Sequence, residues 1–265
     1  MARVDLGQVT LNVEESGDPG GAPVMFAGAL GTDLAIWDGV VAALPGRFRA
    51  IRYDLRGHGG SDCPSGPYGM GALVHDAEAR LEALMLRDAV FVGLSVGGLV
   101  AQGLAVKRID LVRGLVLSGT APKIGTKAGW QARAAEVRAE GMTAVSDAVM
   151  ARWFSQKVRA GGKLDWVRDM LDRQDPEGYA ATCEAIAGTD FLTPTSGLHL
   201  PALVTVGTED RSTPPDLVRE LADLIPGSRF ELLRGAGHLP CVDSPALFAD
   251  TLTGFLTAIG HGDSA

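Results

Sequence analysis

The segment 93–97, with the sequence Gly-Leu-Ser-Val-Gly, places a serine where it could act as a nucleophile. It directly follows the apolar run 89–92, which predicts a strand that turns sharply into a helix with Ser95 at the apex. Glycines at positions 93 and 97 remove side chains that would collide with the neighbouring strand or helix. The pattern alone is weak evidence, because a chain with 12 serines and 35 glycines contains it by chance about 0.2 times.

A serine hydroxyl becomes nucleophilic when a base removes its proton, and an imidazole base needs a carboxylate to orient it. Asp210 follows the apolar run 203–207, and His238 lies in the loop after the predicted strand 230–233. Both positions follow late strands, so we take Ser95, Asp210 and His238 as the candidate catalytic residues. Glu209 is the alternative acid, and the other histidines are the rival bases: His58, His75, His199 and His261.

Acyl transfer by a serine also needs hydrogen-bond donors aimed at the developing oxyanion. The backbone N–H of Val96, directly after the candidate nucleophile, is one expected donor. The second is expected from the glycine-bounded loop 28–31, at the N–H of Ala29 or of its neighbour Leu30. We favour Ala29 and keep Leu30 as the alternative.

Strand and helix patterns alternate along the chain, after an opening hairpin over 4–15. This alternation predicts an α/β fold with a mostly parallel sheet that is flanked by helices on both faces. The strands are expected at 23–27, 48–53, 89–92, 111–117, 202–207 and 230–233. The helices between them are expected at 36–44, 73–84, 98–107, 215–225 and 245–259.

One long stretch interrupts the alternation. Four helical segments follow one another without a strand signal, at 130–140, 144–154, 164–173 and 176–187. We interpret this stretch as an inserted helical lid over the carboxyl edge of the sheet. The expected organisation is a first core part (1–122), the lid (123–190), a second core part (191–259) and a flexible tail (260–265).

Composition excludes several classes of function. The formal net charge of −8 disfavours nucleic acid and anionic membranes as partners. Three scattered cysteines are too few for a disulfide framework or a zinc site, and no apolar run is long enough to span a membrane. We expect a cytoplasmic protein.

With these features, the sequence resembles the α/β-hydrolase superfamily from position 4 to 259, and the position of the acid in that family favours Asp210 over Glu209. Within it the chain resembles the 3-oxoadipate enol-lactonases. The matching segments are 30–34 with Trp37 and Asp38, 54–59, 119–126 with Trp130, 152–154, 178–186 and 213–215. The apolar tripeptide 27–29 departs from this pattern, since polar residues are expected there.

This resemblance implies that Ser95 opens an enol-lactone through an acyl-enzyme, with a small anionic lactone or ester as substrate. It also implies that the reaction needs neither a metal nor a cofactor. Leu30, Trp37 and Trp153 lie in matching segments and are expected to contact it. Arg152 is the expected partner of the substrate carboxylate, because a guanidinium binds a carboxylate in a fork geometry. A monomer or small homo-oligomer is expected.

Two alternatives remain open. The chain could be another hydrolase of this fold, acting on carboxylic esters or on carbon–carbon bonds of ring-cleavage products. It could also be a non-catalytic receptor that uses the pocket only to bind a ligand, although the intact serine, acid and base disfavour this.

Overall fold

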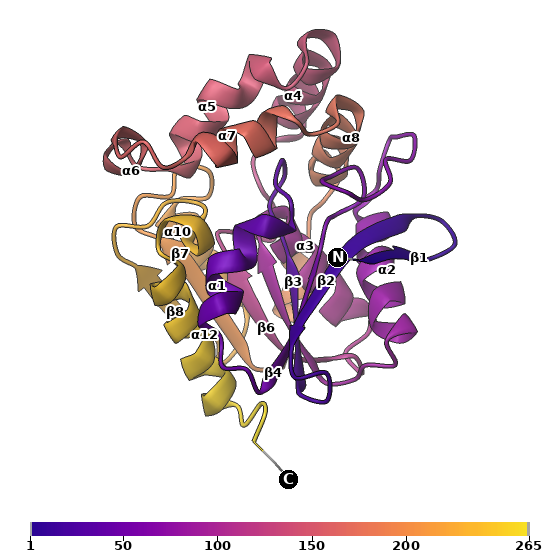
Figure 1. The fold of residues 1–265 in the computed structure, drawn as a ribbon, viewed down its shortest axis with the longest axis vertical. Coiled ribbons are helices and arrows are strands. Elements are labelled where there is room, and N and C mark those ends of the chain that lie inside the picture. Colours follow the sequence, from indigo (N-terminus) through magenta and orange to yellow (C-terminus); the bar gives the residue numbers. More distant parts are fainter. Residues whose placement is uncertain (1, 264–265) are drawn as a thin grey trace.

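The computed structural model describes residues 2–263 and contains one eight-stranded sheet (Figure 1). The strands run in the order β1-β2-β4-β3-β5-β6-β7-β8. Pairing is antiparallel between β1 and β2 and between β2 and β4, and parallel across the rest of the sheet. Their bounds are Ala2–Asp5 (β1), Thr10–Gly17 (β2), Ala22–Ala27 (β3), Phe48–Tyr53 (β4), Ala89–Leu94 (β5), Val112–Ser118 (β6), Ala202–Gly207 (β7) and Arg229–Leu233 (β8).

Helices cover both faces of this sheet, which confirms the predicted α/β-hydrolase architecture. Helix α1 (Asp38–Ala43), preceded by the short turn η1 (Leu34–Trp37), packs against α12 (Pro245–Ala258). Helices α2 (Met70–Ala83) and α3 (Val96–Lys107) pack against each other, and α3 also contacts β5 and β6. The central strands β5 and β7 are buried along their whole length, as their continuous apolar sequences require. Helix α10 (Pro215–Leu224) packs against β7.

The lid lies over the carboxyl ends of the parallel strands (Figure 1). Its helices are α4 (Lys127–Glu140), α5 (Thr143–Trp153), α6 (Gln156–Ala160), α7 (Asp165–Asp172) and α8 (Pro176–Ala187), and α9 (Leu192–Ser196) follows. The two ends of this insertion lie side by side, since Lys123 pairs with Asp190 at 2.9 Å and the Phe191 N–H donates to the Pro122 carbonyl. The chain therefore leaves and rejoins the core at one place.

The lid also touches the core at the loop after β4. Gly59 N–H donates to the side-chain oxygen of Gln174 at 3.0 Å. Gly57 and Gly178 approach so closely that a Cβ on Gly178 would lie 2.1 Å from the Gly57 carbonyl oxygen. Two glycines thus allow the N-terminal part of α8 to rest directly on core backbone.

The predicted flexible tail differs from the structure over residues 260–263. His261 is buried, its Nε2 lies 3.0 Å from the carbonyl oxygen of Pro23, and its ring stacks on Phe48. The stretch after α12 therefore packs against the start of β3 and β4. The glycine and polar residues of this stretch predict a flexible tail, but the imidazole ring of His261 packs against Phe48. Residues 264–265 lie outside the described residues.

Candidate active site

Ser95 sits at the turn between β5 and α3 in a strained conformation. Its backbone angles are φ 57° and ψ −115°, a region that residues with a side chain rarely adopt. A Cβ on Gly93 would lie 2.3 Å from the Gly97 carbonyl oxygen, and one on Gly97 would lie 2.4 Å from the Ala27 carbonyl oxygen. Both flanking glycines are therefore required by close backbone contacts, as the sequence pattern predicts.

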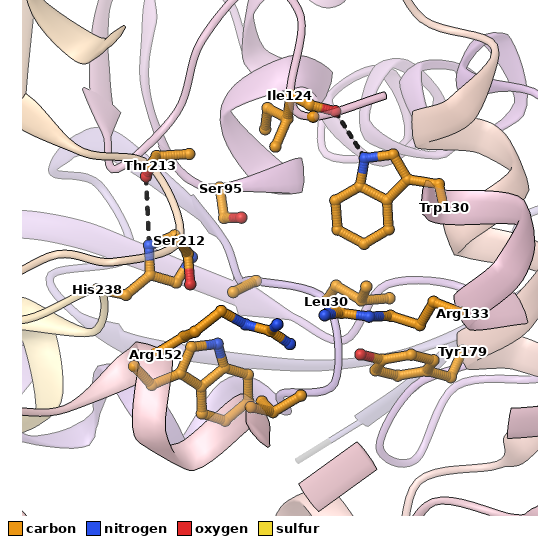
Figure 2. A pocket seen from close by; sticks show the side chains of 14 residues that line it. Leu30, Ser95, Ile124, Trp130, Arg133, Arg152, Tyr179, Ser212, Thr213 and His238 are labelled. Atoms are coloured by element: carbon orange, nitrogen blue, oxygen red, sulfur yellow. Dashed lines mark hydrogen bonds between the residues drawn. The ribbon is translucent and has the colours of Figure 1, made fainter. Parts of the chain in front are cut away.

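Neighbouring strands hold this turn in place. The Ser95 N–H donates to the Ser118 carbonyl at the end of β6, at 2.9 Å. The Thr120 hydroxyl donates to the Ser95 carbonyl at 2.7 Å. Because both peptide groups of Ser95 are fixed, its strained backbone cannot relax, and the hydroxyl stays directed into the pocket (Figure 2).

His238 and Asp210 form a buried pair at the carboxyl edge of the sheet. The Nδ1 atom of His238 lies 2.8 Å from Oδ2 of Asp210. The other carboxylate oxygen accepts the N–H groups of Ser212 and Thr213 at 2.8 and 2.9 Å. The hydroxyl of Thr213 donates to Oδ2 at 2.9 Å. These contacts fix the Asp210 side chain in a position to orient the imidazole and to stabilise its protonated form.

The rival acid and bases lie elsewhere. Glu209 is exposed, and His199 and His75 are on the surface. His58 is buried in the loop after β4, and burial lowers its pKa to about 4. Of the five histidines, His238 is the one that lines the pocket with Ser95.

The expected oxyanion donors lie around the same point. Val96 begins α3, so its N–H has no acceptor within the helix. The Ala29 carbonyl accepts the N–H and the hydroxyl of Thr32, which fixes the loop that presents the Ala29 and Leu30 amides. The Gly97 N–H donates to the Gly28 carbonyl at 3.1 Å and ties this loop to the serine turn. Ala29 and Leu30 both line the pocket, and the choice between their amides stays open.

The pocket is a cavity of about 180 Å³ between the core loops and the lid. The core contributes Ala29, Leu30, Ser95, Ser212, Thr213 and His238, and the lid contributes Ile124, Gly125, Trp130, Arg133, Val149, Arg152, Trp153 and Tyr179.

Two arginines give this pocket its charge. Arg133 from α4 and Arg152 from α5 both point into the cavity (Figure 2). Burial, followed by the nearby Arg133 charge, lowers the pKa of Arg152. Its Nη2 atom is buried without a hydrogen-bond partner, and among residues 2–263 neither arginine forms a salt bridge. Two neighbouring cations without a carboxylate partner make the cavity a site for an anion.

The structure thus brings most of the predicted site residues together, but not Trp37. Leu30, Arg152 and Trp153 line the pocket. Trp37 is fully buried in the core, with its ring 5.1 Å from that of Phe26 and 5.8 Å from that of Phe248. Trp37 therefore packs in the core and does not line the pocket, contrary to its predicted contact with a substrate.

Sequence reasoning did not single out several lid residues that line the cavity. Trp130 is held by a hydrogen bond from its indole Nε1 to the Ile124 carbonyl at 2.6 Å, and the Arg133 guanidinium lies over its ring. Their spacing of three residues on a helix was the available signal for a shared face. Tyr179 lies within a matching segment, but only the fold shows that its ring faces the arginines (Figure 2). Cys241 is buried, and burial raises the pKa of its thiol, as for a cysteine that packs in the core.

Other classes of site find little support in the described residues. Among residues 2–263, no three His, Cys, Asp or Glu side chains are grouped so that they could hold a metal ion. No helix within that range has the length and apolar character needed to cross a membrane.

Comparison with known proteins identifies the family. The model of the alpha/beta hydrolase family matches residues 24–251. The chain belongs to the alpha/beta hydrolase family. As a hydrolase of this family, it carries serine, acid and histidine in the chain order that the family uses.

Among the relatives of this hydrolase, 3-oxoadipate enol-lactonase 2 of Acinetobacter baylyi is 34% identical over 91% of this chain and 90% of its own length. The crystal structure of the enol-lactonase from Burkholderia xenovorans LB400 has a TM-score of 0.93 and 38% identity, covering 97% of this chain and all of that one. A malate-bound thermophilic esterase from Thermogutta terrifontis also has a TM-score of 0.93, with 28% identity over 98% of this chain and all of that one.

Proposed function

We propose that this hydrolase opens a small, carboxylate-bearing enol-lactone, and that 3-oxoadipate enol-lactone is its substrate. The observation that carries the proposal is the pair of arginines without carboxylate partners, Arg133 and Arg152, in the cavity that also contains Ser95 and His238. A neutral ester would leave these cations uncompensated, whereas the free carboxylate of such a lactone would pair with them.

The proposed reaction begins when His238 takes the proton of Ser95 and the serine oxygen attacks the lactone carbonyl. The Val96 and Ala29 amides hold the tetrahedral oxyanion. Asp210, with its three hydrogen bonds, stabilises the imidazolium that forms. No side chain beyond these is needed for the first bond exchange.

Collapse of the tetrahedral intermediate breaks the bond to the ring oxygen and releases an enol, which remains tethered because the ring has opened. The enol takes the proton from His238 and tautomerises to a ketone. Water, deprotonated by His238, then attacks the acyl-enzyme, and Ser95 recovers its proton. The product is a 3-oxo dicarboxylate, which carries one more negative charge than the lactone.

Three relatives support this choice of substrate. The two enol-lactonases compared above cover 91% and 97% of this chain, with identities of 34% and 38%. The esterase from Thermogutta terrifontis, described as malate-bound, holds a small dicarboxylate in a closely similar fold. All three are consistent with a pocket for a compact anion.

The test compares turnover of the enol-lactone, followed by its ultraviolet absorbance, with turnover of neutral and acidic p-nitrophenyl esters. We expect the lactone to be the best substrate by kcat/KM. Slow lactone turnover beside rapid turnover of simple esters would instead indicate an esterase. The Ser95→Ala variant should lose all of these activities, and a protein that binds ligand but turns over none of the substrates would be a receptor.

A further inference from the structure

The backbone that carries His238 is held from two sides. On the core side, the N–H of Gly237 donates to Oδ2 of Asp243 at 2.7 Å. On the lid side, the N–H of His238 itself donates to the carbonyl of Trp153 at 2.7 Å. Two consecutive peptide groups are therefore fixed by two different parts of the fold, and one of these parts is the lid.

On the lid side, the backbone of Gly237 lies in close contact with the backbone of Trp153 and Phe154. A Cβ on Gly237 would lie 2.2 Å from the Trp153 carbonyl oxygen and 3.3 Å from the Cα of Phe154. Glycine at this position is required by that close approach. Because interiors are close-packed, a shift of the Trp153 carbonyl must be followed by the backbone at 237–238.

Trp153 is the last residue of α5, and the residue before it is Arg152. The side chain of Arg152 reaches the cavity, where its Nη2 atom has no partner in residues 2–263 and the charge of Arg133 opposes its own. The unpaired cation in the pocket and the carbonyl that holds the candidate base therefore belong to adjacent residues.

We propose that the end of α5 couples recognition of the substrate carboxylate to the position of His238. A carboxylate on Arg152 relieves the repulsion from Arg133 and fixes the last turn of α5. The Trp153 carbonyl then holds His238 in the orientation that serves Ser95. Binding energy from a remote part of the substrate would therefore raise kcat as well as affinity. This inference rests on the proposed function in one respect, namely that the substrate is acidic.

Arg133 is the matched control for this coupling. It lines the same cavity and carries the same charge, but it lies on α4, and no hydrogen bond of the described residues joins α4 to the loop 235–238. Loss of Arg133 should remove attraction for the carboxylate without loosening His238.

The test uses the acidic p-nitrophenyl monoester of glutarate and the neutral p-nitrophenyl butyrate. With the acidic ester, we expect Arg152→Gln to lower kcat about tenfold and to raise KM, while Arg133→Gln raises KM with little change in kcat. Arg152→Lys should restore part of kcat. If both glutamine variants change KM alone, the coupling is wrong and the arginines serve only to bind.

A second measurement needs no variant that could fail to fold. Propionate is added to the wild-type protein while it hydrolyses p-nitrophenyl butyrate. We expect kcat to rise severalfold at saturating ester, because the free carboxylate occupies Arg152 while the short ester occupies Ser95. Purely competitive inhibition with kcat unchanged would overturn the coupling. Turnover of these esters that persists in Ser95→Ala would instead contradict the proposed function, so the two failures are distinguishable.

Discussion

At the scale of single residues, the candidate site depends on backbone contacts that only glycine permits. Ser95 keeps a positive φ because Gly93, Gly97 and the hydrogen bonds of Ser118 and Thr120 leave it no other conformation. The backbone strain therefore lies in the residue whose hydroxyl is expected to react. A change at a neighbouring glycine should therefore affect the site before it affects the rest of the fold.

Gly97→Ala tests this dependence. The new methyl group would meet the Ala27 carbonyl oxygen at 2.4 Å, so we expect a loss of about 1–3 kcal/mol in the free energy of unfolding. Esterase activity should fall by more than this stability loss explains, because Ser95 and the Ala29 loop move apart. Denaturant unfolding and steady-state kinetics measure both effects. Gly254→Ala on α12, where a Cβ meets nothing within 4 Å, should be neutral or slightly stabilising.

The contribution of Asp243 to stability should decrease as pH rises, whereas a carboxylate with a lowered pKa contributes more as pH rises. Burial, with smaller contributions from Glu209 and Asp210, raises the pKa of Asp243 to about 6. Since the folded protein then binds this proton more tightly than the unfolded chain, the contribution of Asp243 to stability decreases as pH rises from about 4 to about 6.

Asp243→Asn removes this titration but can still accept the N–H of Gly237. We expect the unfolding free energy of the variant, relative to wild type, to increase between pH 4 and pH 6 and to stay constant above. Asp250→Asn, which replaces an exposed carboxylate on α12, is the control. A flat difference for Asp243→Asn would contradict the raised pKa.

The contribution of His58 to stability should increase as pH rises. Its pKa is lowered to about 4 by burial, so the folded protein keeps the ring neutral while the unfolded chain protonates it near pH 6.5. Its contribution is fully present above pH 6.5 and is lost as pH falls toward about 4. His58→Gln should flatten the stability profile over this window, as measured by urea unfolding at several pH values. His199→Gln, which replaces an exposed histidine, is the control.

At the scale of elements, the lid lines one side of the cavity that contains Ser95, and one of its close contacts with the core is at α8. Helix α8 rests on the loop after β4 through Gly57 and Gly178. The N–H of Gly59 in the same loop donates a hydrogen bond to the side chain of Gln174, which lies just before α8. These contacts fix the distance between α8 and the core.

Gly178→Ala tests the contact between α8 and the loop after β4. The added methyl group would lie 2.1 Å from the Gly57 carbonyl oxygen, so α8 must move away from the core. Because Tyr179 follows and lines the pocket, we expect KM for an acidic ester to rise severalfold while the core stays folded by circular dichroism. Gly188→Ala at the other end of α8, where the nearest atom is 3.6 Å from the new Cβ, is the control. Equal effects of both substitutions on KM would contradict a specific role for the contact between Gly178 and Gly57.

The elements themselves were largely predictable. Strands such as β5 and β7 have continuous apolar sequences, and their predicted bounds agree with the structure within two residues. Helices α6 and α9 have five residues each, too few for an amphipathic period to develop, and the sequence did not reveal them. Arg133 and Tyr179 were missed as site residues because the rotation of a lid helix about its axis is set by packing, not by the local pattern.

At the scale of the whole molecule, the order of strands explains why distant residues meet. Ser95 follows β5, and Asp210 and His238 follow β7 and β8, which lie on the same side of β5 in the sheet. All three strands are parallel, so their carboxyl ends share one edge. This part of the site could be predicted from chain order alone. Trp37 could not be placed, because a residue in a matching segment can serve packing as well as contact.

The anchored end of the described chain has a practical consequence. His261 fastens residues 260–263 near the start of β3, at the end of the sheet opposite to the lid (Figure 1). A tether attached after residue 263 would hold the molecule on a solid support with its pocket facing the solution. Immobilised protein coupled this way should therefore keep its full rate, whereas random coupling through surface lysines would obstruct part of the population.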